Sequence, residues 1–228
     1  MGREMGRTAA IAMRTTARCS RCIATLCALL LILACRGGSS EKPEKPLSML
    51  SDTFSLLPGD LLFRRGTSLS SEAVIMADRR GEFSHVGIVA DSAGVMMVVH
   101  AVPDEPDFKG DPDRVKMETP ASFFTTDKAS KGVVCRPNDA EAGKRAAKVA
   151  LETYRRGTLF DHKYNSEDTT TMYCTELVVH CYRKAGYELT GPPTHSYSMP
   201  ILSCTCWLPS DLYHSEGIHE IFLMTSGK

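Results

Sequence analysis

Short apolar runs separated by turn residues predict several β-strands in the middle of the chain. The run 61–63 follows the turn signal Pro58–Asp60. Two runs rich in β-branched residues, 83–90 and 95–101, flank the polar and small residues 91–94. This punctuation predicts a β-hairpin. Two further runs of strand type lie at 133–136 and 218–224.

Three other stretches carry apolar residues at helical spacing. Residues 68–80 begin with serines, which are good helix caps. A second helix is expected after a cap at Asn138 or Asp139, because small and apolar residues then recur along one face. Residues 170–184 form the third candidate, and Gly186 stands where a C-terminal cap belongs.

The first 34 residues have the pattern of an export leader. Five arginines against a single acid precede the apolar run 23–34. As a helix this run rises about 18 Å, which is short of a hydrocarbon core of roughly 30 Å. A removable signal is therefore favoured over a permanent span. An uncleaved anchor is the alternative, and Met13 is an alternative start of the chain.

The segment Ile32–Cys35 resembles the lipobox of bacterial lipoproteins, in which the cysteine is acylated and becomes the first residue. Residues 35–50 are then expected to form a lipidated, flexible tether, because Gly, Ser, Lys, Glu and Pro dominate its composition. Residues 51–228 are the expected folded domain. The expected location is the bacterial cell envelope, with the protein held on a membrane and facing the periplasm or the outside.

Charge and cysteine content narrow the function classes. The 228 residues contain 27 basic and 27 acidic side chains, so the basic excess typical of nucleic-acid binding is absent. Beyond residue 35 five cysteines remain, an odd number. In an oxidising compartment at least one of their thiols lacks an intramolecular partner. The set is Cys135, Cys174, Cys181, Cys204 and Cys206, and its disulfide pairing is open.

Cys174 lies near the start of the predicted helix 170–184. Free N–H groups and the helix dipole at such a position favour the thiolate, which is the nucleophilic form. A small buried apolar residue is the alternative interpretation, since free cysteines are often that.

Two histidines on the predicted hairpin favour the interpretation of Cys174 as a nucleophile. A turn centred between residues 92 and 93 pairs Ala90 with Val95 and sets His85 opposite His100. Both side chains then share one face, with Cβ atoms about 5 Å apart. Two half-exposed histidines on a solvated face are the alternative. A cysteine with one imidazole as base and a second as orienting group is an arrangement for nucleophilic catalysis.

Five motifs in order carry a family resemblance. They are Gly-Asp-Leu-Leu-Phe at 59–63, Ser-His-Val-Gly-Ile-Val at 84–89, Val-Val-His-Ala at 98–101, Phe-Asp with a tyrosine at 160–164, and Tyr-Cys-Thr-Glu-Leu-Val at 173–178. Residues 56–186 thereby resemble the circularly permuted papain-like hydrolases of the NlpC superfamily, YiiX/YebB type. The resemblance implies an α+β fold in which an antiparallel sheet packs against helices and the histidine motif precedes the cysteine.

The resemblance also assigns roles by position. Cys174 is the implied nucleophile, His85 the general base and His100 the orienting residue, at a position where relatives often have a glutamate. Further family positions, offered as candidates for the substrate pocket, are Tyr173, Asp60 and Asp161.

The expected activity is that of a cysteine amidase or peptidase that works through a thioester and needs no cofactor or metal. Peptidoglycan peptides are the leading substrate class, by analogy of fold. Three alternatives stay open. First, two histidines and a cysteine can also bind zinc. Second, the fold also suits a hydrolase or acyltransferase that acts on lipids or N-acyl amides, as in relatives of lecithin retinol acyltransferase. Third, the protein could bind an envelope ligand without catalysis.

Overall fold

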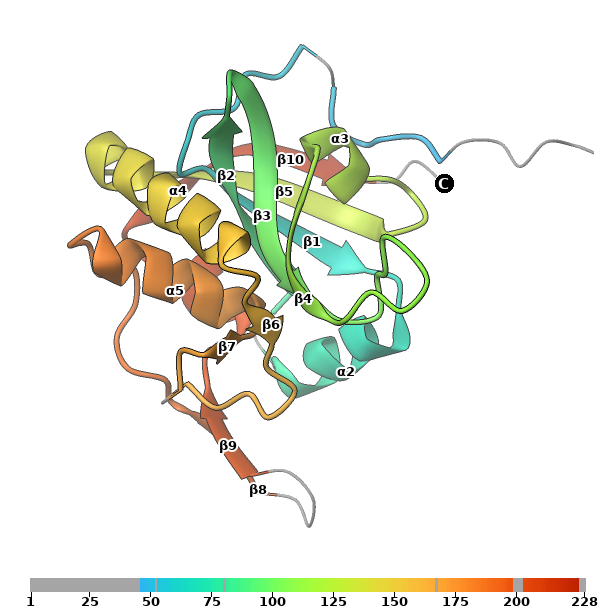
Figure 1. Ribbon diagram of the computed structural model, residues 1–228, viewed down its shortest axis with the longest axis vertical. Coiled ribbons are helices and arrows are strands. Elements are labelled where there is room, and N and C mark those ends of the chain that lie inside the picture. Colours follow the sequence, from blue (N-terminus) through green and yellow to red (C-terminus); the bar gives the residue numbers. More distant parts are fainter. Residues whose placement is uncertain (1–45, 52, 80, 167, 199–202, 226–228) are drawn as a thin grey trace, which may run out of the picture. The chain divides into compact units, whose positions relative to one another are not determined.

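A large β-sheet forms the centre of the computed structural model (Figure 1). Its strands are β1 (Leu61–Gly66), β2 (His85–Ser92), β3 (Val95–Val102), β4 (Arg114–Glu118), β5 (Ala129–Pro137), β6 (Leu159–Phe160), β7 (Thr171–Met172) and β10 (Ile218–Thr225). They lie in the order β10-β5-β1-β2-β3-β4-β6-β7. Neighbours are antiparallel except for the short parallel pair β6 and β7. A separate hairpin joins β8 (His195–Ser198) and β9 (Ser203–Cys206).

Helices cover both faces of this sheet, because alternate residues of its central strands are apolar on each side. The helices are α2 (Leu69–Ala77), α3 (Pro120–Phe123), α4 (Ala140–Arg155), α5 (Cys174–Lys184) and α6 (Pro209–Tyr213). Val86 and Ile88 of β2 belong to the core beneath α4 and α5, whereas Val89 packs with Phe123 of α3 in a second core. The expected α+β architecture is confirmed.

The structure describes residues 46–228 except 52, 80, 167, 199–202 and 226–228. The predicted leader and the predicted lipidated Cys35 lie outside these residues. Within them, no helix combines the length and the apolar character needed to cross a bilayer. The last residues of the predicted tether are held on the folded body: the Thr126 N–H donates to the Leu47 carbonyl at 2.9 Å, and Leu50 is buried. The body therefore begins before the expected boundary at residue 51.

Local signals place the helix ends. The Asp139 side chain accepts the Ala142 N–H at 2.9 Å and starts α4. Gly186 has the positive φ of 76° expected of a C-terminal cap after α5. Helix α5 starts at Cys174 rather than at residue 170, because Thr171 and Met172 pair with β6 as a strand. Cys174 is thus the first residue of the helix.

The hairpin of β2 and β3 has a different register from the expected one. Ser92 pairs with Val95, and the two turn residues Ala93 and Gly94 have positive φ angles of 56° and 87°. This is the geometry of a tight two-residue turn that matches the twist of the strands. The expected register was therefore wrong by two residues.

A shift of two residues keeps every side chain on its face, because side chains alternate with period two. His100 now lies opposite Gly87, and a Cβ atom built on Gly87 would stand 3.2 Å from the His100 Cβ. His85 and His100 are therefore diagonal neighbours on one face, a separation that two imidazole rings can bridge.

Candidate active site

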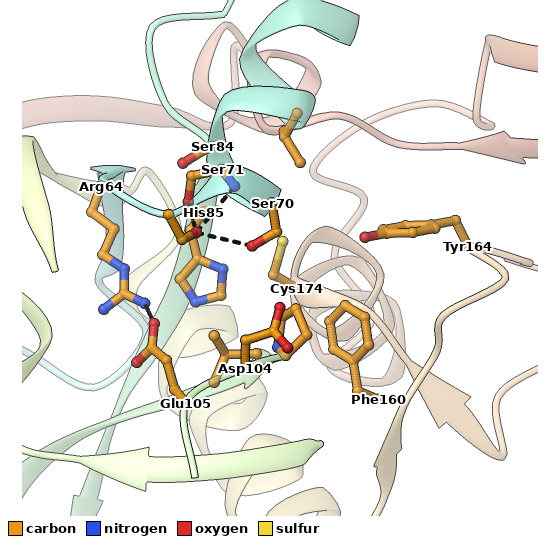
Figure 2. A pocket seen from close by; sticks show the side chains of 14 residues that line it. Arg64, Ser70, Ser71, Ser84, His85, Asp104, Glu105, Phe160, Tyr164 and Cys174 are labelled. Atoms are coloured by element: carbon orange, nitrogen blue, oxygen red, sulfur yellow. Dashed lines mark hydrogen bonds and ion pairs between the residues drawn. The ribbon is translucent and has the colours of Figure 1, made fainter. Parts of the chain in front are cut away.

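A pocket opens at the end of the sheet where β2 begins (Figure 2). Cys174 and His85 both line it, and Figure 2 shows their side chains directed into it. Helix α5 packs on the face opposite His85, yet its first residue lines the same pocket as His85, which is the first residue of its strand. The remaining lining residues include Arg64, Ser68, Ser70, Ser71, Val74, Ser84, Asp104, Glu105, Phe160 and Tyr164.

The Cys174 thiol is held in its protonated form. Burial raises the pKa of the thiol, and hydrogen bonds from the backbone N–H groups of Val86, Thr175 and Cys174 itself act in the opposite direction. The N–H groups at the helix start favour the thiolate as expected, but desolvation outweighs them. A base must accept the proton when the sulfur attacks.

His85 is well placed to be that base. Its Nε2 lies 2.9 Å from Nδ1 of His100, which leaves Nδ1 of His85 for the pocket that contains Cys174. Burial, followed by the charge of Arg64, lowers the pKa of His85 well below its ordinary value. The imidazole is therefore neutral at pH 7 and able to accept a proton.

A third group extends the line of side chains. Nε2 of His100 lies 3.2 Å from Oε1 of Glu118 on β4. The other carboxylate oxygen of Glu118 accepts from Ser122 Oγ at 2.6 Å and from Lys128 Nζ at 2.7 Å. Burial raises the pKa of Glu118, but hydrogen bonds and charge from His100 and Lys128 outweigh burial and hold it far below its ordinary value. Glu118 is thus an anion beneath the histidine pair.

The sequence prediction missed Glu118. Strand β4 was not expected, because Arg114–Glu118 is a charged segment with few apolar residues. The structure pairs Glu118 with Val98 of β3, which makes it a diagonal neighbour of His100 on the same face. The signal that the sequence did offer is the alternation of polar and apolar residues in Arg-Val-Lys-Met-Glu, which is typical of a strand with one polar face.

Comparison with known proteins identifies the family. The family model of permuted papain-like amidase enzymes, YaeF/YiiX, C92 family, matches residues 55–221. The chain belongs to this family. It is a cysteine amidase of the permuted papain-like type. The expectation of such an enzyme is confirmed.

A solved structure supports the fold. The crystal structure described as that of the metalloprotein YiiX from Escherichia coli O157:H7 superposes with a TM-score of 0.61 at 18% sequence identity. The match covers 76% of this chain and 100% of that chain. At this identity the likeness shows the fold alone. No protein with a curated description matches the chain.

The three further family positions do not line the amidase pocket. Asp60 accepts from Arg136 Nε at 2.8 Å and from the Leu57 N–H at 2.8 Å, so it fixes a turn to β5. Tyr173 is buried, and its hydroxyl accepts the Trp207 N–H at 2.9 Å. In this structure both side chains contact the body of the fold, outside the lining of this pocket.

Asp161 acts on the pocket through its loop. Its carboxylate accepts the backbone N–H groups of Lys163 and Asn165, which closes a tight turn. That turn presents Tyr164, at a positive φ of 52°, to the pocket. Asp161 therefore shapes the wall without lining it.

The donor set of the amidase pocket does not fit a metal ion. Among the described residues, no group of three or more His, Cys, Asp or Glu side chains is arranged to hold one. Nε2 of His85 and Nδ1 of His100 face each other at 2.9 Å, so these two nitrogens cannot both turn to one ion. The zinc alternative therefore does not fit this arrangement of side chains.

Proposed function

We propose that the amidase cleaves its substrate with Cys174 as nucleophile, His85 as general base and His100 as the residue that orients His85. The observation that carries this proposal is the position of His85, which shares the pocket with Cys174 and contacts His100 at 2.9 Å. Glu118 fixes His100 from the far side.

The proposed reaction has two halves. His85 Nδ1 accepts the Cys174 proton as the sulfur attacks the amide carbonyl, and the backbone N–H of Cys174 helps to bind the oxyanion. The imidazolium then gives this proton to the leaving amine, and a thioester remains. In the second half His85 takes a proton from water, the hydroxide attacks the thioester, and the acid and the free thiol are released.

The proposed substrate is a peptide amide of the cell wall. Serine hydroxyls and the carboxylate of Asp104 surround the nucleophile, so the pocket offers many hydrogen-bonding groups. Such a lining suits a polar peptide chain. The predicted leader and lipid anchor at Cys35 would hold the enzyme at the envelope, facing the periplasm or the outside, where this substrate occurs.

One observation favours the second candidate, an N-acyl amide or lipid substrate. Helix α2 borders the pocket with Ser70, Ser71 and Val74, while Leu69 and Met76 on its other side are 91% and 80% exposed. None of the residues of α2 is buried. Exposed apolar side chains on a helix that borders the pocket suit an enzyme that meets its substrate at a lipid surface.

A parallel incubation separates the two substrate classes. The full chain is incubated with purified muropeptides and with fatty-acyl amides, and the products are read by mass spectrometry. We expect cleavage of a muropeptide amide by the wild-type chain and none by Cys174→Ala. Cleavage of the acyl amides alone would select the second candidate, and cleavage of either class by Cys174→Ala would overturn the role of Cys174. Transfer of the acyl group to an added amine would identify an acyltransferase.

A further inference from the structure

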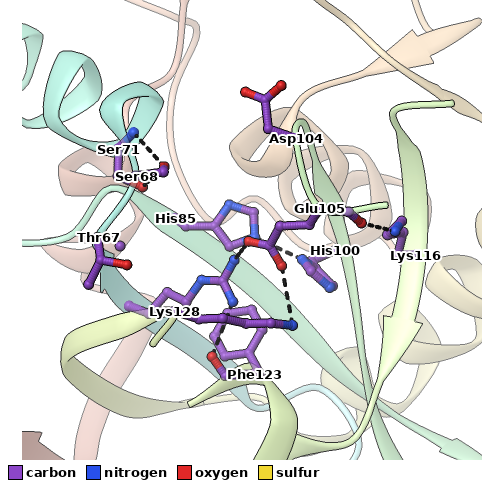
Figure 3. Close-up of polar contacts among 12 residues, drawn as sticks. Thr67, Ser68, Ser71, His85, His100, Asp104, Glu105, Lys116, Phe123 and Lys128 are labelled. Carbon is purple, nitrogen blue, oxygen red and sulfur yellow. Dashed lines mark hydrogen bonds and ion pairs between the residues drawn. The ribbon is translucent and has the colours of Figure 1, made fainter. Parts of the chain in front are cut away.

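Four charged side chains form a closed ring beside the histidine pair, and Figure 3 shows two of them, Glu105 and Lys128, next to His85 and His100. Arg64 pairs with Glu105, Glu105 lies 3.3 Å from Lys128, Lys128 lies 2.7 Å from Glu118, and Glu118 lies 3.8 Å from Arg64. Each cation thus contacts both anions, and the ring is neutral as a whole. Its members come from β1, from the loop after β3, from β4 and from the segment before β5.

Arg64 is the member of the ring that lies on the strand paired with that of His85. It lies directly opposite His85 in the pairing of β1 with β2 and is 3% exposed. Its guanidinium lies over the Phe123 ring at 4.6 Å and donates to the Phe123 carbonyl at 3.1 Å. The rings of His85 and His100 pack on the same phenyl ring, at centroid distances of 5.7 Å and 5.3 Å. Arg64 and both imidazoles therefore share one support.

Glu105 connects the ring to the pocket. It lines the pocket together with Arg64 and His85, whereas Glu118 lies behind His100. The loop that carries Glu105 is also held from its outer side, where Arg114 donates to Asp111 at 2.8 Å and lies 3.0 Å from Asp107. The loop is thus tied to the sheet by Arg64 at Glu105 and, on its outer side, by Arg114 and Lys116 at Asp107 and Asp111.

We propose that Arg64 is a positioning residue of this amidase: through Glu105 and Glu118 it ties the pocket wall to the histidine pair and keeps His85 in the form that accepts a proton. The inference rests on the proposed function only in taking His85 as the base. A planar, permanently charged guanidinium suits this place because it can serve a carboxylate, a carbonyl and a ring face at once.

The electrostatic signs follow from the charges that face the two imidazoles. These groups are Arg64, Glu105, Glu118, Lys128 and Cys174. Asp104 lies at the pocket wall. Lys116 is paired with His100 across the strands, but its amine contacts the 105–111 loop. After burial, Arg64 lowers the pKa of His85. The pKa of His100 is lowered by burial and by Arg64, and raised by Glu118 and Glu105. Loss of Arg64 and loss of Glu105 must therefore move the pKa of His100 in opposite directions.

The test is an NMR titration of the histidines in full-length Cys174→Ser protein, which removes coupling to the thiol. We expect Arg64→Gln to raise the pKa of both His85 and His100, Glu105→Gln to lower that of His100, and the double variant to return it towards the starting value. Arg64→Lys, which keeps the charge, should leave both pKa values near the starting point. The matched control is Arg114→Gln, which loosens the same loop without touching the histidines and should move neither pKa.

Opposite shifts of the pKa of His100 in Arg64→Gln and in Glu105→Gln indicate positioning by charge. A simple loss of structure would move this pKa in the same direction in both variants. Shifts of equal sign, no shift, or an Arg114→Gln effect equal to that of Arg64→Gln would overturn the proposal. If Arg64→Gln does not fold, Arg64→Lys should leave the pKa of His100 unchanged while Glu105→Gln lowers it, and any other pattern overturns the proposal.

A second measurement keeps this proposal apart from the proposed function. The rate of Cys174 alkylation by iodoacetamide is followed against pH in protein that retains the cysteine. We expect the acid limb of the rate to move to higher pH in Arg64→Gln. If the NMR shifts appear while alkylation shows no limb in any variant, the role of Arg64 stands and the assignment of His85 as the base of Cys174 fails. A limb that is present in wild type and does not move in Arg64→Gln overturns the role of Arg64.

Discussion

Nε2 of His85 faces Nδ1 of His100 at 2.9 Å, so the proton positions of the two rings are linked. The Glu118 carboxylate can only accept, and its Oε1 at 3.2 Å favours the tautomer of His100 that carries the proton on Nε2. Nδ1 of His100 is then an acceptor for the Nε2–H of His85. Nδ1 of His85 is left without a proton, as a base towards Cys174 must be. The buried anion thereby sets the tautomer of a residue that it does not contact.

Cys174 is expected to be the thiol that reacts with an electrophilic probe. Cys174→Ala should remove the fastest phase of labelling by iodoacetamide at pH 7, because the sulfur lines a pocket together with a base. Cys135→Ala is the matched control: burial raises the pKa of Cys135 to about 12, and this variant should label like the wild type. Mass spectrometry of the labelled chain gives the readout. Undiminished labelling of Cys174→Ala would exclude Cys174 as the nucleophile.

Glu118→Gln should lower kcat by about 100-fold or more on the amide substrate that the parallel incubation identifies. The amide of glutamine can donate to Nε2 of His100, which moves the His100 proton to Nδ1 and places a proton on the wrong nitrogen of His85. KM should change little, because Glu118 does not line the pocket. Glu188→Gln, which alters an exposed ion pair with Arg183, is the control. A kcat close to that of wild type would contradict the tautomer argument.

Glu176→Gln should make the protein more stable at alkaline pH. Burial raises the pKa of Glu176 to about 8, despite the opposing hydrogen bond from the Tyr173 N–H. Between about pH 4.5 and about pH 8 the unfolded chain has released this proton and the folded chain has not, so the free energy of unfolding falls as pH rises. The glutamine keeps an acceptor for Tyr173 and removes this loss.

Urea unfolding at pH 5 and pH 9 measures the effect. We expect the stability of Glu176→Gln relative to wild type to increase by a few kcal/mol, roughly, from the lower to the higher pH. A relative stability that is the same at both pH values would show that Glu176 ionises with its ordinary pKa.

Ala93→Asn should stabilise the fold by about 0.5–1 kcal/mol. Ala93 has a positive φ of 56° at the first turn position of the hairpin, a conformation that asparagine adopts more easily than alanine. Gly94→Ala is the opposing variant and should destabilise, although a Cβ there meets no atom within 4 Å, because its φ is 87°. Thermal unfolding measures both. Stabilisation by both substitutions would contradict the assignment of this turn.

Much of the fold could be predicted from patterns among residues close together in the sequence. Serine and aspartate caps, the two-residue alternation of the hairpin and the glycine after α5 are properties of neighbouring residues, and the elements around them formed where expected. The error of two residues in the hairpin register left His85 and His100 on one face, because the period of a strand is two. The histidine pair was therefore predictable even though the turn was misplaced.

The sequence by itself determined the kind of chemistry: a cysteine at a helix start, and two histidines on one side of a hairpin. The tertiary structure decided what makes them work together. Antiparallel pairing of β4 with β3 brings Glu118 beside His100, and the pairing of β1 with β2 brings Arg64 beside His85. Both contacts join residues distant along the chain, and burial sets the protonation of Cys174 and His85. Neither these two contacts nor the burial of the side chains can be recognised in the local sequence, because each depends on which strands and helices pack together in the folded chain.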